Sequence, residues 1–291
     1  MALTPRALLR AAALCAAAFA ALMVAAYGWS DARRVDASAL QGFLGLERPA
    51  TEQVFDAFAR LGDPLQVGLI GVALAALAVA RGRPRVGLFV IALLGATSVS
   101  SQALKALLAY PRYDGTIDGL YVSAAAFPSG HSTAAMAMAI ALVVVMPSRL
   151  RPVAAVVGMA LALSISFSVV ALGGHFPSDV VGGYLLATGW ALVLLAGLRW
   201  AGERYPERTW RTGLATIARR GVEGVAAVGL VAALVAGLFA AAGLAALIAA
   251  RQPDLMAFAQ DNTAFLAVAG AIALTAAALL GAWAGALARR G

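Results

Sequence analysis

Long apolar runs dominate this sequence and restrict what it can fold into. A helix needs about 20 apolar residues to cross about 30 Å of hydrocarbon, and the chain has about eight runs close to that length. They cover residues 8–29, 65–80, 86–109, 132–146, 153–172, 179–198, 222–250 and 265–287. We therefore predict an all-α polytopic membrane protein with about eight transmembrane helices, and we expect the fourth helix to begin at or before His131.

The composition excludes an ordinary water-soluble fold. Of the 291 residues, 62% are hydrophobic and 12% are charged, whereas an average soluble domain is about 45–50% apolar and about 25% charged. A net charge of +8 would suggest a nucleic-acid partner in a soluble protein. Here the arginines lie in short connections between apolar runs, so we expect no nucleic acid and assign the basic charge to membrane orientation.

Every second connection is rich in arginine, and this pattern predicts the orientation. Short cytoplasmic loops of membrane proteins accumulate Lys and Arg. We therefore place both termini in the cytoplasm, across a bacterial-type inner membrane, and the intervening connections in the periplasm. The basic residues are Arg6 and Arg10, Arg81, Arg83 and Arg85, Arg149 and Arg151, six arginines from Arg199 to Arg220, and Arg289 and Arg290.

The chain divides into three parts at its most polar stretch. Residues 1–198 are predicted to form a six-helix transmembrane core, 199–221 a basic cytoplasmic connection, and 222–291 two additional transmembrane helices. The first run is either a cleaved signal peptide or an uncleaved anchor. Its length exceeds the roughly 7–15 apolar residues of a signal peptide and favours the anchor.

Residues 51–61 have a mixed composition between the first two runs. Val54, Phe58 and Leu61 share one face of a helix at this spacing. The segment is either a short helix in the membrane interface or an outer loop packed on the bundle.

A short polar turn leads into the fourth run. Residues 127–132 read Phe-Pro-Ser-Gly-His-Ser. The N-terminus of a helix presents unpaired backbone N–H groups and a positive dipole end, which favour a phosphate. Gly130 allows close approach of the backbone, Ser129 can donate from its hydroxyl, and His131 can protonate a departing oxygen. In the alternative interpretation, Ser129 only caps the helix.

A second polar turn lies between the fifth and sixth runs, where residues 173–179 read Gly-Gly-His-Phe-Pro-Ser-Asp. Asp179 follows His175 by four residues, so its carboxylate can keep one imidazole nitrogen protonated and leave the other as a nucleophile. Alternatively, Asp179 caps the helix and His175 is a loop residue. The chain has just two histidines, and both fall in these two turns on the same predicted face, which favours a shared site.

Two cations stand near the end of the third run. Lys105 and Arg112 are seven residues apart, with Pro111 ending the helix between them. Arginine binds phosphate oxygens through its fork of donors, and lysine binds them as a point charge. Each is alternatively an interfacial cation whose stem lies along the apolar surface.

Together these residues resemble the type 2 phosphatidic acid phosphatase (PAP2) superfamily, which includes membrane lipid phosphatases. Its first motif is a lysine followed seven residues later by Arg-Pro, and Lys105 and Arg112 match it. Its second motif, Pro-Ser-Gly-His, is intact at residues 128–131, and its third, Ser-Arg-x5-His-x3-Asp, aligns with residues 168–179. The resemblance covers spans three to six and implies a six-helix core to which the last two helices are added.

The resemblance implies a mechanism without a cofactor or metal ion. His175 attacks phosphorus to form a phosphohistidine, Asp179 orients it, and His131 protonates the leaving group. The phosphoryl oxygens are held by Lys105, Arg112, Ser129 and the N–H of Gly130. The loop carboxylates of Asp114 and Asp118 are expected to be solvated and not to bind a metal.

Two positions depart from the family pattern. Tyr113 replaces a proline that shapes a loop, and Val169 replaces the arginine of the third motif. A hydrogen bond to a charged group contributes about 1.5–3 kcal/mol, so the missing arginine costs roughly 10- to 200-fold unless another group compensates. Related head-group transferases keep the two histidines and the aspartate without this arginine.

The sequence therefore predicts a metal-independent membrane phosphatase that hydrolyses a lipid phosphate or diphosphate at the periplasmic face. The alternatives are a lipid phosphotransferase or head-group transferase with the same site, or a catalytically weakened lipid binder or transporter. The expected partners are the lipid substrate and the bilayer. Neither the identity of the lipid nor the oligomeric state is encoded in a readable motif.

Overall fold

The structure is a computed structural model that describes residues 4–47, 49–113, 117, 121–204 and 255–288. Its elements are helical, which confirms the all-α prediction. They are α1 (Pro5–Gly28), α2 (Ser30–Leu44), α3 (Pro49–Arg60), α4 (Pro64–Ala80), α5 (Pro84–Leu107), α6 (Gly130–Val145), the short 3-10 helix η1 (Ser148–Leu150), α7 (Arg151–Ala171), α8 (Pro177–Arg204), α10 (Leu255–Asp261) and α11 (Thr263–Ala288).

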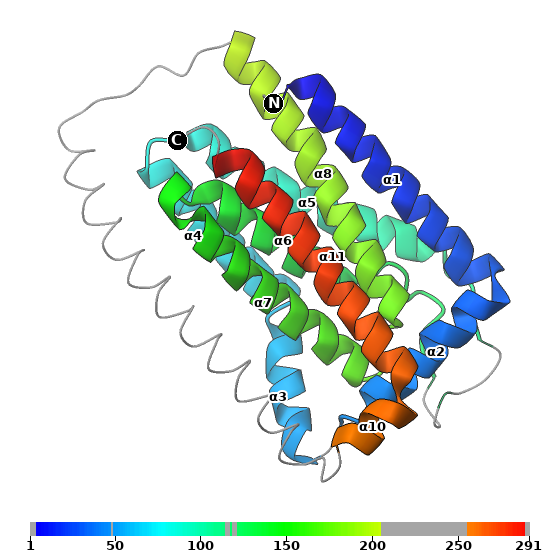
Figure 1. The fold of residues 1–291 in the computed structure, drawn as a ribbon. Coiled ribbons are helices and arrows are strands. Elements are labelled where there is room, and N and C mark those ends of the chain that lie inside the picture. Colours follow the sequence, from blue (N-terminus) through cyan, green and yellow to red (C-terminus); the bar gives the residue numbers. More distant parts are fainter. Residues whose placement is uncertain (1–3, 48, 114–116, 118–120, 205–254, 289–291) are drawn as a thin grey trace.

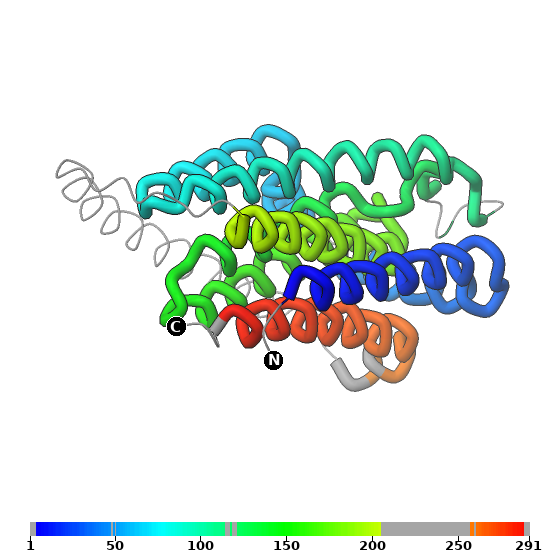
Figure 2. The backbone as a smooth tube through the Cα atoms, turned by 90° about the horizontal axis from the view of Figure 1, so that it is seen from above, coloured from blue at the N-terminus to red at the C-terminus, as the bar shows by residue number. Residues whose placement is uncertain are grey.

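The long helices run between two ends of one bundle (Figures 1 and 2). At one end, Arg83 donates to the carbonyl of Val145, and Arg151 donates to the carbonyl of Leu287. We call this the arginine end; it holds the α4–α5 and α6–α7 connections and the last turns of α8 and α11. The opposite end carries α2, α3 and α10 and is called the histidine end, because both histidines lie there.

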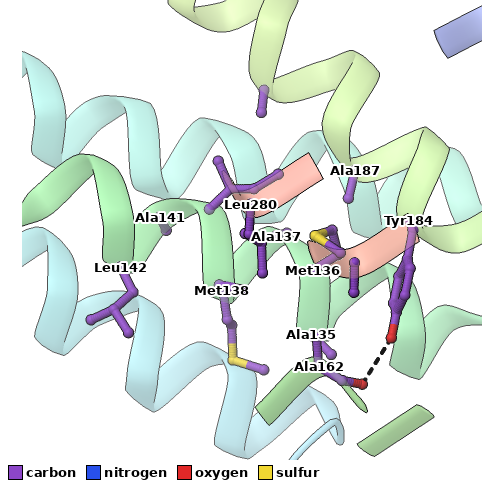
Figure 3. Close-up of a cluster of buried hydrophobic side chains, with 14 of the residues drawn as sticks. Ala135, Met136, Ala137, Met138, Ala141, Leu142, Ala162, Tyr184, Ala187 and Leu280 are labelled. Atoms are coloured by element: carbon purple, nitrogen blue, oxygen red, sulfur yellow. Dashed lines mark hydrogen bonds between the residues drawn. The ribbon is translucent and has the colours of Figure 1, made fainter. Parts of the chain in front are cut away.

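Helix α6 is the centre of the bundle. It contacts α4, α5, α7, α8 and α11, and nearly all of its residues from Ser132 to Val145 are buried. Small residues allow this packing: a Cβ on Gly158 of α7 would lie 2.8 Å from that of Ala139. Figure 3 shows the alanines and methionines of α6 packed beside Tyr184, whose hydroxyl donates to the carbonyl of Ala162. The helix starts at Gly130, which confirms the expected start at or before His131.

Five of the described helices are long and apolar enough to cross a membrane, and the bent pair α3–α4 makes a sixth. The five helices are α1, α5, α7 with the preceding η1, α8 and α11. Their number and length support a multi-pass membrane protein. The apolar helix α6 has 16 residues and is shorter than these candidates. The predicted run 222–250 and most of the connection 199–221 lie outside the described residues, so the division at residues 198 and 221 stays a prediction. Helix α11 packs against α2 and α7 of the core.

Residues 30–60 form two helices where the sequence predicted at most one. Helix α3 confirms the helical interpretation; it packs on α7 and buries Phe55 and Phe58. Helix α2 was not predicted, because its charged residues interrupt the apolar pattern, although Ala37, Leu40 and Phe43 form a buried face at helical spacing. Between α3 and α4 the chain bends by 53°.

Candidate active site

The first turns of α6 and α8 lie side by side at the histidine end. The backbone N–H of Ser129 donates to the carbonyl of Asp179 at 3.0 Å. Gly183 makes the approach possible, because a Cβ there would lie 2.9 Å from the Ser129 carbonyl oxygen and from Thr133. His131 is in the first turn of α6. The contact therefore brings the two polar turns of the sequence together.

A glycine turn between α7 and α8 places His175. Gly173 has φ +72°, a conformation that glycine adopts without strain. Its N–H donates to the carbonyl of Val170, and the N–H of Gly174 donates to that of Val169. These two bonds form a Schellman motif, which ends α7 and reverses the chain. His175 then lies two residues before Pro177, where α8 begins.

Asp179 holds His175 from the first turn of α8. Its side chain is fully buried, and Oδ2 lies 3.4 Å from Nδ1 of His175. The same oxygen accepts from the backbone N–H of Phe176 at 2.9 Å. A carboxylate at Nδ1 favours the tautomer with a proton on that nitrogen, because the carboxylate only accepts. Nε2 then keeps its lone pair.

Arg112 occupies the other side of the Asp179 carboxylate. One guanidinium nitrogen forms an ion pair with Oδ1 of Asp179, and the other donates to Oγ of Ser178 at 2.9 Å. The guanidinium carbon lies 4.4 Å from the centre of the Phe176 ring and 5.3 Å from that of Tyr27 on α1. Arg112 is thus at the predicted site, but these protein contacts already use donors that the sequence assigned to a phosphate.

Asp36 on α2 is a site residue that the sequence did not identify. Its carboxylate accepts from the N–H of Ser178 at 2.9 Å and from the Ser178 hydroxyl at 2.6 Å, which caps the N-terminus of α8. Oδ2 also lies 3.5 Å from Arg112. The guanidinium of Arg33, one turn earlier, donates to the carbonyl of Arg112. The apolar spacing of Ala37, Leu40 and Phe43 could have predicted this helix. Asp36 directly precedes Ala37, so the prediction would have placed it at the edge of the buried face.

The environment of Asp36 predicts a pH-dependent stability. Burial raises the pKa of this carboxyl to about 6, although Arg112 lowers it. A pKa raised on folding stabilises the protein at low pH, and this contribution is lost as the pH rises through about 6. Asp36→Asn should therefore gain stability relative to the wild type between pH 5 and pH 7.5, by on the order of 1–3 kcal/mol. Thermal melting in detergent measures the difference.

Asp31 on the same helix provides the matched control. Its carboxylate is exposed and pairs with Arg34, and these contacts lower its pKa. Asp31→Asn should show no such gain between pH 5 and pH 7.5. A constant difference between wild type and Asp36→Asn across this range would contradict the assignment.

His131 has a carboxylate partner on a different element. Its Nε2 lies 3.1 Å from Oδ1 of Asp63, which immediately precedes α4. The turn before α4 also covers the ring, because a Cβ on Gly62 would lie 2.7 Å from Cδ2 of His131. The side chains of His131 and Asp63 are 33% and 44% exposed, so this imidazole is reached from outside more easily than the buried His175. Asp63 lies in a connection that the sequence analysis assigned to the periplasm, but no sequence pattern linked it to His131.

Part of the sequence matches the model of a known protein family. The sequence model of the PAP2 superfamily matches residues 67–203, which run from α4 to the end of α8. This segment of the chain is similar to the PAP2 superfamily. The matched PAP2 segment contains both histidines, Asp179, Lys105 and Arg112, whereas Asp36 and Asp63 come from the elements before it.

A solved structure supports the PAP2 fold. The chain is similar to the crystal structure described as the first transmembrane PAP2 type phosphatidylglycerolphosphate phosphatase from Bacillus subtilis, with a TM-score of 0.54 and 24% sequence identity. The match covers 69% of this chain and 98% of that one. None of the curated proteins compared with the sequence matches it.

The remaining PAP2 motif residues lie around the start of α6. Lys105 is in the last turn of α5, with Nζ 3.7 Å from the position that a Cβ would take on Gly130. The Ser129 hydroxyl accepts from the N–H of Ser132 at 3.3 Å and so caps α6, which is the structural role allowed for it. A capping hydroxyl still has its own proton to donate, so its predicted contact with phosphate stays open.

The position of the PAP2 arginine is apolar in this chain. Val169 is buried in the last turn of α7. The Tyr113 ring, at the position of the PAP2 proline, stacks on that of Phe176 with centroids 6.5 Å apart. Next to His131 in the sequence, Ser132 begins a buried chain of hydrogen-bonded hydroxyl groups that continues through Ser166 to Tyr184.

The carboxylates and histidines of the described part of the chain are not arranged as a metal site. Within residues 4–47, 49–113, 117, 121–204 and 255–288, no group of three or more His, Cys, Asp or Glu side chains is placed to hold a metal ion. Asp114 and Asp118 lie outside these residues. The described site contains two imidazoles, each beside a carboxylate, with Arg112 on Asp179 and Lys105 near Gly130.

Proposed function

We propose that this chain is a lipid phosphatase that hydrolyses a phosphate or diphosphate group through a phosphohistidine, without a metal ion, at the periplasmic face of the inner membrane. One observation carries the proposal: His175 and His131 start adjacent helices, and each imidazole contacts a carboxylate. Such a pair supplies a nucleophile and a general acid to a single phosphoryl group.

In the first step, the lone pair on Nε2 of His175 attacks phosphorus and forms the N–P bond. The P–O bond to the lipid breaks, and the departing oxygen takes the proton from His131. Asp179 stabilises the positive charge that develops on His175, because Oδ2 faces Nδ1.

In the second step, His131 takes a proton from water as the water oxygen attacks phosphorus. The N–P bond breaks, inorganic phosphate leaves, and both histidines return to their starting states. Asp63 holds the His131 ring in both steps. Lys105 and the backbone N–H groups at the start of α6 stabilise the charge on the phosphoryl oxygens.

The distribution of arginines supports the orientation. The connections after α4 and after α6 meet at the arginine end, together with the start of α1. Positive charge on one side of a bundle favours the cytoplasm for that side, and the histidine end then faces the periplasm.

A phosphate-release assay in excess chelator tests the proposal. Purified protein in detergent is given phosphatidate, phosphatidylglycerol phosphate, polyprenyl diphosphate or lipid A, and inorganic phosphate is measured. Phosphatidylglycerol phosphate is tested first, because the matched solved structure carries that name. We expect release from at least one lipid, with a 10²- to 10⁴-fold loss, roughly, in His131→Ala. Turnover that stops on chelation and returns with a metal ion would contradict the metal-independent mechanism.

A transferase is the second candidate, and Val169 is the observation that favours it. The buried valine stands where the PAP2 motif has an arginine, and related head-group transferases likewise keep the two histidines and the aspartate without this arginine. An added lipid or glycan acceptor would then capture the labelled phosphoryl group in preference to water.

The remaining alternative is a lipid binder or transporter with weakened catalysis. In that case Val169→Arg should create or strongly increase phosphate release. Rapid turnover by the unmodified protein would exclude this alternative.

A further inference from the structure

Asp63 stands where a helix cap is expected, but its side chain has another partner. It directly precedes Pro64, the first residue of α4, and aspartate is a preferred residue at such a position. Its carboxylate makes no capping hydrogen bond to α4, a helix that the structure describes throughout. Oδ1 lies 3.1 Å from Nε2 of His131 instead. Capping therefore does not explain this aspartate, whereas the contact with the proposed proton donor does.

Backbone hydrogen bonds on both sides hold the turn that carries Asp63. The N–H groups of Gly62 and Asp63 donate to carbonyls in the last turn of α3. The carbonyl of Asp63 accepts from the N–H of Val67 in α4. Asp63 is thus fixed at the 53° bend between the two helices, and its carboxylate meets His131 from a position that the backbone sets.

This turn covers one edge of the His131 imidazole. Cδ2 and Nε2 are bonded neighbours in the ring, and Nδ1 lies on the opposite edge. A Cβ on Gly62 would lie 2.7 Å from Cδ2, and Asp63 contacts Nε2, so both atoms of the first edge face the turn. Nδ1 makes no hydrogen bond to a residue that the structure describes. It is therefore the nitrogen that is left for a phosphoryl group.

The two histidines then present opposite nitrogens to the substrate. His175 has Nδ1 beside Asp179, whereas His131 has Nε2 beside Asp63. A carboxylate only accepts hydrogen bonds, so in neutral His131 the proton stays on Nε2 and Nδ1 carries the lone pair. In protonated His131, Nδ1 holds the second proton, and the carboxylate stabilises the positive charge.

We propose that Asp63 is a positioning residue for the proton transfers of the reaction, and that Nδ1 of His131 is the atom that performs them. In the first step, the Nδ1 proton passes to the lipid oxygen as the P–O bond breaks, and His131 becomes neutral. In the second step, Nδ1 takes a proton from the attacking water, and the N–P bond to His175 breaks. Nε2 keeps its proton throughout. The inference rests on the proposed function and adds the reacting atom.

Asp63 is the carboxylate available to balance the charge on His131. The other ionisable groups of the site are Lys105 at the end of α5, Arg112, and His175 and Asp179 beside the start of α8. Asp179 is the acid in this set, and it is already paired with Arg112 and His175. Removing the charge of Asp63 therefore changes how readily His131 takes up a proton, while the partners of His175 stay in place.

Nitrogen NMR of the full chain in detergent tests the assignment without requiring activity. The chain has two histidines, so labelling histidine with a heavy nitrogen isotope gives two imidazoles, and His175→Ala leaves His131 alone. In neutral His131 we expect the proton on Nε2 and the lone pair on Nδ1, and in neutral His175 the opposite arrangement. A neutral His131 with its proton on Nδ1 overturns the proposal.

Phosphate release tests the role in the reaction. Asp63→Asn should lower kcat for the lipid substrate by roughly 10- to 100-fold, with little change in KM, because the groups that hold the phosphoryl oxygens remain. The fall in rate on the alkaline side should also move to lower pH by about one pH unit, because the carboxylate no longer stabilises the protonated imidazole. Asp63→Glu keeps the charge and should restore the pH profile towards that of the wild type.

Asp56→Asn is the matched control. Asp56 lies on α3, is half exposed and pairs with Arg60, so its variant should keep the rate and pH profile of the wild type. An Asp63→Asn protein with the wild-type rate overturns the proposal, and so does a lower rate with an unchanged pH profile, which a purely structural role would give. If Asp63→Asn fails to fold, the nitrogen shifts of the wild type decide. If the wild type releases no phosphate, the proposed function fails, while those shifts still decide which nitrogen Asp63 holds.

Discussion

His175→Ala is expected to lower phosphate release by about 10⁴-fold or more. The change removes the nitrogen that forms the N–P bond, and loss of a catalytic nucleophile has an effect of this size in enzymes with a comparable arrangement. The buried imidazole is replaced by a methyl group, so Asp179 keeps Arg112 and the Phe176 N–H as partners. Release of phosphate from the lipid found in the substrate screen gives the rate.

A trapping experiment separates loss of chemistry from loss of fold. Wild-type protein quenched during turnover of a phosphorus-labelled substrate should carry an acid-labile, base-stable label, and His175→Ala should carry none. Arg149→Gln at the opposite end should retain the label, and all three proteins should melt cooperatively. Full turnover by a folded His175→Ala protein would remove this residue as the nucleophile.

Asp179→Asn has the second largest expected effect, a loss of about 10³- to 10⁴-fold. An amide has one oxygen and one NH₂ group, whereas the carboxylate offers an acceptor oxygen both to His175 and to Arg112. If the amide donates to Nδ1, the imidazole proton moves to Nε2, and the attacking lone pair is lost. In the serine protease triad, the same aspartate-to-asparagine change costs about 10⁴-fold for this reason.

Asp36→Asn is the matched control for Asp179→Asn. Both carboxylates contact Arg112, but Asp36 does not contact His175 among the hydrogen bonds and ion pairs that the structure describes. If Asp179 acts by orienting the imidazole, Asp36→Asn should lose at least tenfold less activity. Equal losses in two folded variants would show that Asp179 acts chiefly through Arg112.

Tyr27 and Asp36 connect the site to the N-terminal helices. Arg112 lies beneath the Tyr27 ring of α1 and beside Asp36 of α2. The PAP2 segment begins only at residue 67, so these contacts come from outside the matched region. The N-terminal helices therefore hold Arg112 and the start of α8 in position.

The sequence by itself determined the fold class and the histidine motifs. Apolar runs near 20 residues leave few alternatives to membrane helices, because the periodicity is local and the length requirement is set by the bilayer. Pro-Ser-Gly-His and the His175–Asp179 spacing are also local, so their residues were found without a structure. The structure places all of the predicted site residues at one end of the bundle.

Only the tertiary structure decided which groups from distant segments meet. Asp63 is 68 residues from His131 and Asp36 is 142 from Ser178, and no local pattern links residues so far apart. Whether Arg112 faces solvent or two carboxylates depends on how α1, α2 and α8 pack. The same holds for Arg83 and Arg151: their presence predicted the orientation, but helix packing decides that Arg83 contacts the end of α6 and Arg151 the end of α11.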